Sequence, residues 1–314
     1  ALTGTPIENR LSELWSIFDF LMPGLLGTRE SFAKRFESPV EHAEGDSAAR
    51  LQALVSPFVL RRVKEDVVAD LPEKIEDTVM AQLTGEQRKL YLANQDRIAQ
   101  QVQHREAGEF KKDKLKVLAE LTKLRQICCD PRLHYEDYKA GSAKLDTCME
   151  LVHGALDGGH RILLFSQFTG MLDIIAKRLA KEDIAFLKLT GASSKESRAK
   201  MVAQFQAGEV PVFLISLKAG GVGLNLTAAD VVIHYDPWWN VAAQDQATDR
   251  AHRIGQQHTV TVYKLIAKGT IEERIMQMQE SKRDLVNSVL GGDGISSALF
   301  TREDVLALLG GDGR

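Results

Sequence analysis

Two arginines are spaced so that they could act on a phosphate together. In the stretch QDQATDRAHRIGQ, Gln246, Arg250 and Arg253 are four and three residues apart, so a helix would carry them on one face. Guanidinium groups hold phosphate oxygens in a fork, and an arginine finger stabilises charge on a phosphoryl group in transfer. The alternative is a solvated charged helix face in which Asp245 and Asp249 pair with the arginines.

A glycine-rich segment ends a predicted buried strand. The stretch Leu214–Asn225 runs from apolar residues through Ser216 and Lys218 into three closely spaced glycines, Gly220, Gly221 and Gly223. Glycines let the backbone approach a ligand, and successive amides can bind an anion. Open α/β sheets bind ligands at this end of their strands. A plain turn between a strand and a helix explains the pattern equally well.

The stretch Asp236–Asn240, DPWWN, places two tryptophans side by side after another predicted strand. We do not expect both of them in the core, so one should lie on a loop surface. An exposed indole can wedge against a sugar or a base. Packing between domains is an equally good explanation for either tryptophan alone.

Several catalytic motifs are absent from the sequence as given. It contains no GxxxxGK[ST] phosphate loop, no GxSxG, no HExxH and no complete GxGxxG. The segment Asp249–His252 lacks the second carboxylate and the preceding apolar strand of a magnesium-binding acidic box, so a polar helix face explains it better. The sequence therefore offers nothing that could cradle the inner phosphates of a nucleotide unaided.

The composition is that of a globular protein of about two domains. Of the 314 residues, 44% are apolar and 26% are charged, which excludes general disorder, collagen and coiled coils. No uncharged apolar run approaches the length of a membrane-spanning helix, so we expect no membrane. The net charge of −3 limits any nucleic-acid surface to a local patch.

The cysteines support neither a disulfide framework nor a metal site. There are three, Cys128, Cys129 and Cys148, and no CxxC pair occurs. We expect a reducing, intracellular compartment. The chain begins with alanine and shows no secretory signal, so we expect a fragment of a longer protein.

After Gly141, strands and helices alternate. Predicted strands, rich in Val, Ile and Leu, cover Arg161–Phe165, Ile184–Leu189, Val210–Ser216, Val231–Tyr235 and Thr259–Ala267. A helix is predicted over Val241–Arg253. Alternation of this kind predicts an α/β fold with a parallel sheet that is covered on both faces.

The preceding part of the chain reads as helices and loops. Two long amphipathic helices are predicted over Thr84–Gln103 and Lys111–Cys128, after an extended connector over Lys74–Leu83. Seven basic and four acidic residues give Arg105–Arg125 a local charge of +3. This surface supports an alternative function, a stand-alone nucleic-acid-binding or protein-docking module.

The order and spacing of the motifs indicate a family, which no single motif does. Seven blocks follow the order found in the Swi/Snf family of double-stranded DNA translocases, which the chain resembles over about residues 2–291. Four of them resemble helicase motifs III to VI, in order Leu2–Asn9, Ile162–Phe168, Leu214–Leu226 and Gln244–Gln256. The other three are Leu60–Arg62, Leu124–Pro131 and Asp236–Asn240.

The resemblance implies a RecA-like sheet with helices on both faces and helical insertions on its N-terminal side. The family motor has two such lobes, and this chain starts at the last motif of the first one. It therefore implies a second lobe that is inactive as an ATPase alone. The implied domains are residues 1–75 (end of motif III and a helical protrusion), 76–140 (connector and second protrusion), 141–269 (helicase C-terminal lobe), 270–291 (brace helix) and 292–314 (tail).

The resemblance also implies roles for single residues. The catalytic arginine fingers are Arg250 and Arg253. Nucleotide contacts are implied for Gln246, Gly221, Gly223 and Asn225. DNA contacts are implied for Ser166, Gln167, Gly191, Ser216, Lys218 and Trp239. The residues that couple the two lobes are Thr5 and Pro6.

The implied cofactors are ATP and Mg²⁺, bound only together with a first lobe. The implied partners are double-stranded DNA, an upstream RecA-like lobe of the same protein, and RNA polymerase or a DNA-bound protein. Glu8 and the lack of a chromatin-reader segment favour a bacterial source. We expect a cytoplasmic, nucleoid-associated protein in that case and a nuclear one in a eukaryote.

Overall fold

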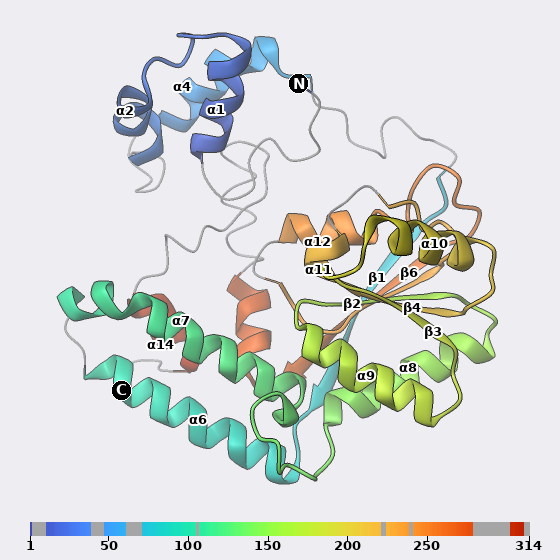
Figure 1. The fold of residues 1–314 in the computed structure, drawn as a ribbon. Coiled ribbons are helices and arrows are strands. Elements are labelled where there is room, and N and C mark those ends of the chain that lie inside the picture. The colour runs from blue at the N-terminus through green and yellow to red at the C-terminus, as the bar shows by residue number, and fades with distance from the viewer. Residues whose placement is uncertain are drawn as a thin grey trace. The chain divides into compact units, whose positions relative to one another are not determined.

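Four short apolar strands and two longer ones, one of them at an edge, build the central sheet. In the computed structural model they form a six-stranded, all-parallel sheet in the order β1-β6-β5-β2-β4-β3 (Figure 1). The strands are β1 Lys74–Gln82, β2 Ile162–Ser166, β3 Phe186–Leu189, β4 Val212–Ser216, β5 Val231–His234 and β6 Val260–Lys268. The structure describes residues 1, 11–38, 47–60, 71–104, 107–220, 224–238, 241–278 and 302–310.

Both faces of the sheet are covered by helices, as Figure 1 shows. Along β2, Ile162 and Leu164 pack into one apolar cluster, and Leu163 and Phe165 pack into the opposite one. The helices are α8 Ala143–Asp157, α9 Thr169–Lys181, α10 Lys195–Gln206, α11 Leu217–Gly220 and α12 Val241–Thr248. The first two lie on one face and the other three on the opposite face. The predicted α/β fold is confirmed, and burial on both sides explains why the strands lack polar alternation.

The segment predicted as a connector, Lys74–Leu83, is instead a strand. β1 pairs in parallel with β6 along its whole length, from Lys74 opposite Val260 to Gln82 opposite Lys268. Most of its side chains are exposed, because β1 is an edge strand. The pairing therefore depends on main-chain hydrogen bonds to β6 and on surface contacts such as the ion pair between Lys264 Nζ and Glu76 Oε2, at 2.6 Å.

The two predicted long helices form a hairpin. They are α6 Gly85–Gln103 and α7 Ala107–Cys129, and a late helix, α14 Arg302–Leu309, packs against α6. Gln95 Nε2 donates to the carbonyl of Leu309, at 2.6 Å. The hairpin is thus joined at its flank to residues more than 200 positions later in the sequence.

A buried ion pair links α8 to the segment after β6, close to the end of the hairpin. Lys144 Nζ lies 2.6 Å from Glu272 Oε2, and both side chains are fully buried. The same Glu272 oxygen accepts from the amide of Ala267, at 2.9 Å. Lys144 also lies over the ring of Tyr235, whose hydroxyl donates to the carbonyl of Cys129. Burial would lower the pKa of Lys144, but attraction to Glu272 raises it above its ordinary value.

The chain divides into two compact units. The first comprises residues 1–69, 239–242 and 277–301, and the second comprises the remainder. The described part of the first unit contains α1 Leu11–Leu21, α2 Arg29–Phe32, the π-helical turn η1 Ala33–Glu37, α4 Ser47–Val55 and the 3-10 turn η2 Ser56–Phe58. Its small apolar core includes Phe18, Phe32 and Leu51. Residues 271–278 are helical, and the rest of the expected brace helix lies outside the described residues.

The cysteines are all buried and free, in agreement with the absence of a disulfide framework. Burial raises the pKa of Cys148 to about 12, which makes its thiol unreactive. Within the described ranges, no helix is both long and apolar enough to cross a membrane. The same residues contain no cluster of three or more His, Cys, Asp or Glu side chains that could hold a metal ion.

Replacing Lys144 by methionine should destabilise the protein strongly. The Glu272 carboxylate would remain buried without its cation, which typically costs about 3–5 kcal/mol. Urea unfolding of the parent and of Lys144→Met measures the difference. The matched control is Lys188→Met, which breaks an exposed ion pair with Asp173 and should change stability by less than about 1 kcal/mol. Equal effects of the two substitutions would contradict a structural role for the buried pair.

Candidate functional site

The parallel sheet gathers the predicted polar residues at one edge. Ser166 ends β2 and Ser216 ends β4, and the two are register partners. Asp236 follows β5, which lies on the other side of β2. Because carboxyl ends of parallel strands share an edge, residues 50 to 70 positions apart meet there.

Asp236 is the centre of a buried network at this edge. Its carboxylate accepts hydrogen bonds from the Ser166 hydroxyl and from the side-chain and backbone nitrogens of Gln167, the latter at 3.2 Å. Ser166, Ser216 and Asp236 are nearly inaccessible to solvent. The Ser166 hydroxyl, predicted to contact DNA, is therefore turned inward in this structure, and Gln167 is held between the sheet and the loop that follows β5.

Arg125 completes this network from the helical hairpin. Its guanidinium donates to Gln167 Oε1, at 3.2 Å, and to the carbonyl of Pro237, and it lies over the ring of Phe168. Sequence reasoning counted Arg125 in a basic surface, but only 1% of the residue is exposed. A helical wheel could have found it, because it lies on the apolar stripe that Leu121 and Cys128 define.

The predicted helix over Val241–Arg253 ends early, at Thr248. Arg250 and Arg253 therefore lie in turns, and the prediction that they share a helix face with Gln246 is wrong. After Thr248 the amides of Arg250 and Ala251 donate to carbonyls three residues earlier, as in turns, and the carbonyl of Arg250 accepts from the amide of Leu226, at 2.9 Å. We call residues 249–255 the arginine turn.

The arginine turn lies beside the end of the glycine-rich segment. The Leu226–Arg250 bond joins the two, and the neighbouring Asn225 is exposed. Gly221 and Gly223 lie outside the described residues. Lys218 belongs to α11, but its side chain is outside the described part. Of the predicted set, the structure therefore places the backbone of Arg250 next to that of Leu226, the residue after Asn225.

The two guanidinium groups differ in environment. Arg250 is half-buried, and its Nε is a buried donor with no hydrogen-bond partner in the described part of the chain. Burial lowers the pKa of Arg250, the charge of Arg253 lowers it further, and Asp249 opposes both. Arg253 is exposed, and no ion pair to it occurs among the described residues. A second positive charge and an unsatisfied donor are what an incoming anion would stabilise.

The end of α12 is attached to the sheet through His234. Its Nε2 lies 2.8 Å from the hydroxyl of Thr248, and its ring stacks on Phe165. Burial, with a smaller contribution from Lys264, lowers the pKa of His234 to about 3. His234 is thus neutral in the folded protein and positions the residues that lead into the arginine turn.

The other predicted residues are more scattered. Gly191 lies in an exposed loop after β3, with open space where a side chain would stand. Gln246 is half-buried in α12. Trp238 packs partly against the apolar core. Three predicted residues lie outside the described part of the chain, Thr5, Pro6 and Trp239.

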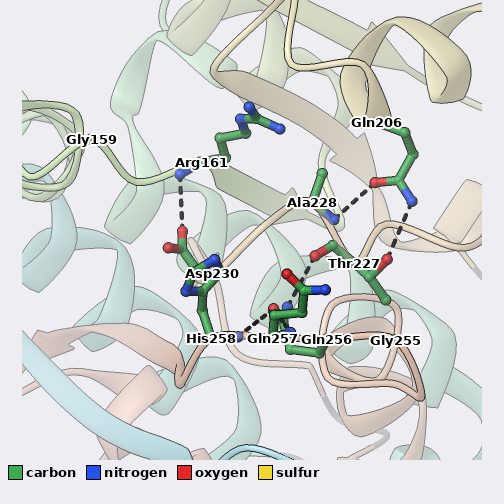
Figure 2. Close-up of a pocket in the computed structure, with 10 residues that line it drawn as sticks. All are labelled: Gly159, Arg161, Gln206, Thr227, Ala228, Asp230, Gly255, Gln256, Gln257 and His258. Carbon is green, nitrogen blue, oxygen red and sulfur yellow. Dashed lines mark hydrogen bonds between the residues drawn. The ribbon is translucent and has the colours of Figure 1, made fainter.

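A cavity of about 390 Å³ opens at the opposite, amino edge of the strands. Figure 2 shows its lining, which includes Arg161 before β2, Asp230 before β5 and His258 before β6. Gln206 and Gln256 also face it, and both bond to the loop that follows the glycine-rich segment. Sequence reasoning gave neither glutamine a role.

Two family models match the chain. The SNF2-related domain matches residues 1–133, and the helicase conserved C-terminal domain matches residues 143–255. A putative ATP-dependent helicase/translocase from Bacillus subtilis, YwqA, is 42% identical over 314 residues, covering 96% of this chain and 34% of that protein. The chain spans about a third or less of the curated relatives it matches, 29% of two Mycoplasma helicases.

Comparison with solved structures points to the same family. The SWI2/SNF2 ATPase C-terminal domain of Sulfolobus solfataricus is 33% identical, with a TM-score of 0.62, and the match covers 75% of this chain and 98% of that one. The SWI2/SNF2 ATPase core from the same organism, solved in complex with dsDNA, is 38% identical with a TM-score of 0.62 and covers 98% and 64%. The chain therefore belongs to the Swi2/Snf2 family of ATP-dependent helicases and translocases, and its sheet is RecA-like.

Acid should destabilise the protein partly through His234. Because the folded pKa lies near 3 and the unfolded pKa near 6.5, only the unfolded chain takes up a proton in between. The resulting stability is present above pH 6.5 and is lost as the pH falls. Between pH 7 and pH 5, the parent should lose about 2 kcal/mol more than His234→Gln does, measured by urea unfolding.

The matched control is His258→Gln, which removes an exposed imidazole. Its stability should follow the parent's pH dependence closely. Parallel curves for the parent and His234→Gln would show that the buried imidazole does not control acid stability.

Proposed function

We propose that this chain is the second motor lobe of an ATP-dependent DNA translocase. In this proposal Arg250 and Arg253 are arginine fingers that act on ATP bound by a first lobe. The chain alone hydrolyses no ATP, because a phosphate loop and an acidic magnesium box must come from that other lobe. The division into a helicase C-terminal lobe over residues 141–269 and flanking protrusions, brace and tail belongs to the same proposal.

The main support is the main-chain bond between Leu226 and Arg250. It holds the arginine turn against the end of the glycine-rich segment, at the place where the family's nucleotide-contacting motifs lie. Arg253 remains exposed there. Arginines that are held by the backbone but leave their guanidinium groups uncovered can reach a phosphate on a facing surface without repacking the core.

ATP fits the donors that this lobe offers. The buried, unsatisfied Nε of Arg250 and the mutual repulsion of the two guanidinium groups would both be relieved by phosphate oxygens. Further nucleotide contacts in this proposal come from Gln246, Gly221, Gly223 and Asn225. Mg²⁺ would arrive with ATP on the first lobe. Because fingers act only when the lobes close, transition-state stabilisation becomes conditional, which is what a motor requires.

The proposed partner is double-stranded DNA, held by its backbone rather than read by sequence. Exposed backbone at Gly191 is suited to phosphate contacts. The DNA contacts in this proposal are Gln167, Gly191, Lys218 and Trp239, and the buried Ser166 and Ser216 have a supporting role. Because Asp236 holds the Ser166 hydroxyl inward, its contribution would be to orient Gln167. Thr5 and Pro6 would couple the lobes, and RNA polymerase or a DNA-bound protein would be displaced or remodelled.

Replacing Arg253 by alanine in the complete protein encoded by the gene should abolish DNA-stimulated ATP hydrolysis. Loss of an arginine finger costs about 10³–10⁵ in rate. Because Arg253 is exposed, stability should change by less than about 0.5 kcal/mol. The control is Arg178→Ala on α9, which breaks an ion pair with Glu182 and should leave turnover unchanged. A fully active Arg253→Ala protein would refute the proposed catalytic role.

The chain of 314 residues, purified alone, should show no ATP hydrolysis above background, with or without DNA. The measurement is phosphate release by a preparation that also unfolds cooperatively, which excludes a misfolded sample. Turnover that copurifies with the folded chain would contradict the assignment to a second lobe.

A further inference from the structure

The side chain of Gln256 forms an unusually complete set of hydrogen bonds. Its Nε2 donates to the carbonyls of Thr227, Ala229 and Ala251, at 3.1, 2.8 and 3.1 Å. Its Oε1 accepts from the amides of Gln257 and His258, at 2.8 and 3.0 Å. The residue is only 6% exposed, so these contacts exchange little with water.

These bonds connect two segments that the proposed function places at the nucleotide. Thr227 and Ala229 follow the glycine-rich segment directly, and Ala251 lies within the arginine turn. The backbone amide of Gln256 also donates to the carbonyl of Arg253, at 2.9 Å. Figure 2 shows the carboxamide of Gln256 against the Thr227–Ala228 loop, at the wall of the cavity.

The arginine turn is thus attached at both ends. At its start, the carbonyl of Arg250 accepts from Leu226, and at its end Gln256 holds the turn to the same loop. Between these two points, His252 Nε2 lies 2.7 Å from the carbonyl of Pro72, before β1. Removing the Gln256 contacts should therefore leave Arg250 and His252 anchored and loosen the part of the turn that follows His252, where Arg253 lies.

We propose that Gln256 is a positioning residue for the arginine finger Arg253, an inference that rests on the proposed function. It touches neither nucleotide nor DNA in this proposal. Its carboxamide sets the distance between the arginine turn and the loop after the glycine-rich segment, and so the place that the Arg253 guanidinium occupies when the lobes close. A displacement of about 1 Å at such a position can cost 10²-fold in rate.

The test uses the complete protein encoded by the gene and compares Gln256→Met with the parent. Methionine has a similar length but makes none of the five bonds. We expect kcat for ATP to fall about 10²-fold, by the same positional argument, while KM for ATP and the affinity for DNA stay within about threefold. The concentration of folded protein is taken from stoichiometric DNA titration, so that a misfolded fraction is not counted as lost turnover.

Gln206→Met is the matched control. Gln206 faces the same cavity and bonds the same loop, through Thr227 Oγ1 at 3.3 Å and the amide of Ala228 at 2.8 Å, but in the described part of the chain it makes no hydrogen bond to the arginine turn. Its kcat should stay within about threefold of the parent's, because Gln206 orders the loop but does not position Arg253. Equal losses in Gln206→Met and Gln256→Met would overturn the inference in favour of general loop stability.

A double-mutant cycle with Arg253→Lys distinguishes a positioning role of Gln256 from a purely structural one. If Gln256 acts through Arg253, the two losses in kcat are not additive, and the double variant is about as slow as the slower single one. Additive losses, or an unchanged kcat in Gln256→Met, would overturn the inference. If Arg253→Lys and Arg253→Ala are both fully active, the proposed function fails instead, so the two failures are distinguishable.

Discussion

The buried pair of Lys144 and Glu272 is the constraint on which much of the second unit depends. An unpaired charge at either position would carry a desolvation cost that the interior could not offset. The two residues must therefore stay together, although one begins α8 and the other follows β6. Through Cys129 and Tyr235, the same cluster fixes the end of α7 to the end of β5. The hairpin is thereby held to the sheet in one arrangement.

This arrangement has consequences at the carboxyl edge. Because α7 is held in place, Arg125 reaches the network of Gln167 and Asp236 from outside the RecA-like fold. The helical insertion and the candidate DNA-contacting loop therefore share one polar network. A movement of the hairpin would displace Gln167, and a displacement of the loop after β5 would move α7.

Arg250 and Arg253 differ from the buried Arg125 in how their guanidinium groups are placed. Their backbone is held by Leu226 and Gln256, but among the residues that the structure describes the Nε of Arg250 has no hydrogen-bond partner and Arg253 is exposed. In a self-sufficient surface, such groups would pair with carboxylates, as Arg178 does with Glu182. Unpaired donors on a rigid turn are instead typical of a site that is completed by another surface.

Much of the fold was predictable from local pattern. Strands such as β2 and β4 are apolar along their whole length, so they can be recognised without an alternating pattern. In α6 and α7 the helical periodicity repeats over many residues and identifies both as helices. Predictions failed where a residue's partner lies far away in sequence. The exposed β1 lacks an amphipathic pattern, because β6 supplies its hydrogen bonds. Arg125 was read as a surface charge, because nothing nearby in sequence shows Gln167.

The sequence by itself determined the family and the α/β architecture, and it supplied the candidate phosphate-contacting residues, because residue type and motif order are properties of the chain. Only the tertiary structure shows that α12 ends at Thr248 and that the Arg250 carbonyl accepts from Leu226. It also shows that Ser166 points inward and that the Gln256 side chain joins two segments. These contacts join residues that are far apart in the sequence, so no periodic pattern in the sequence predicts them.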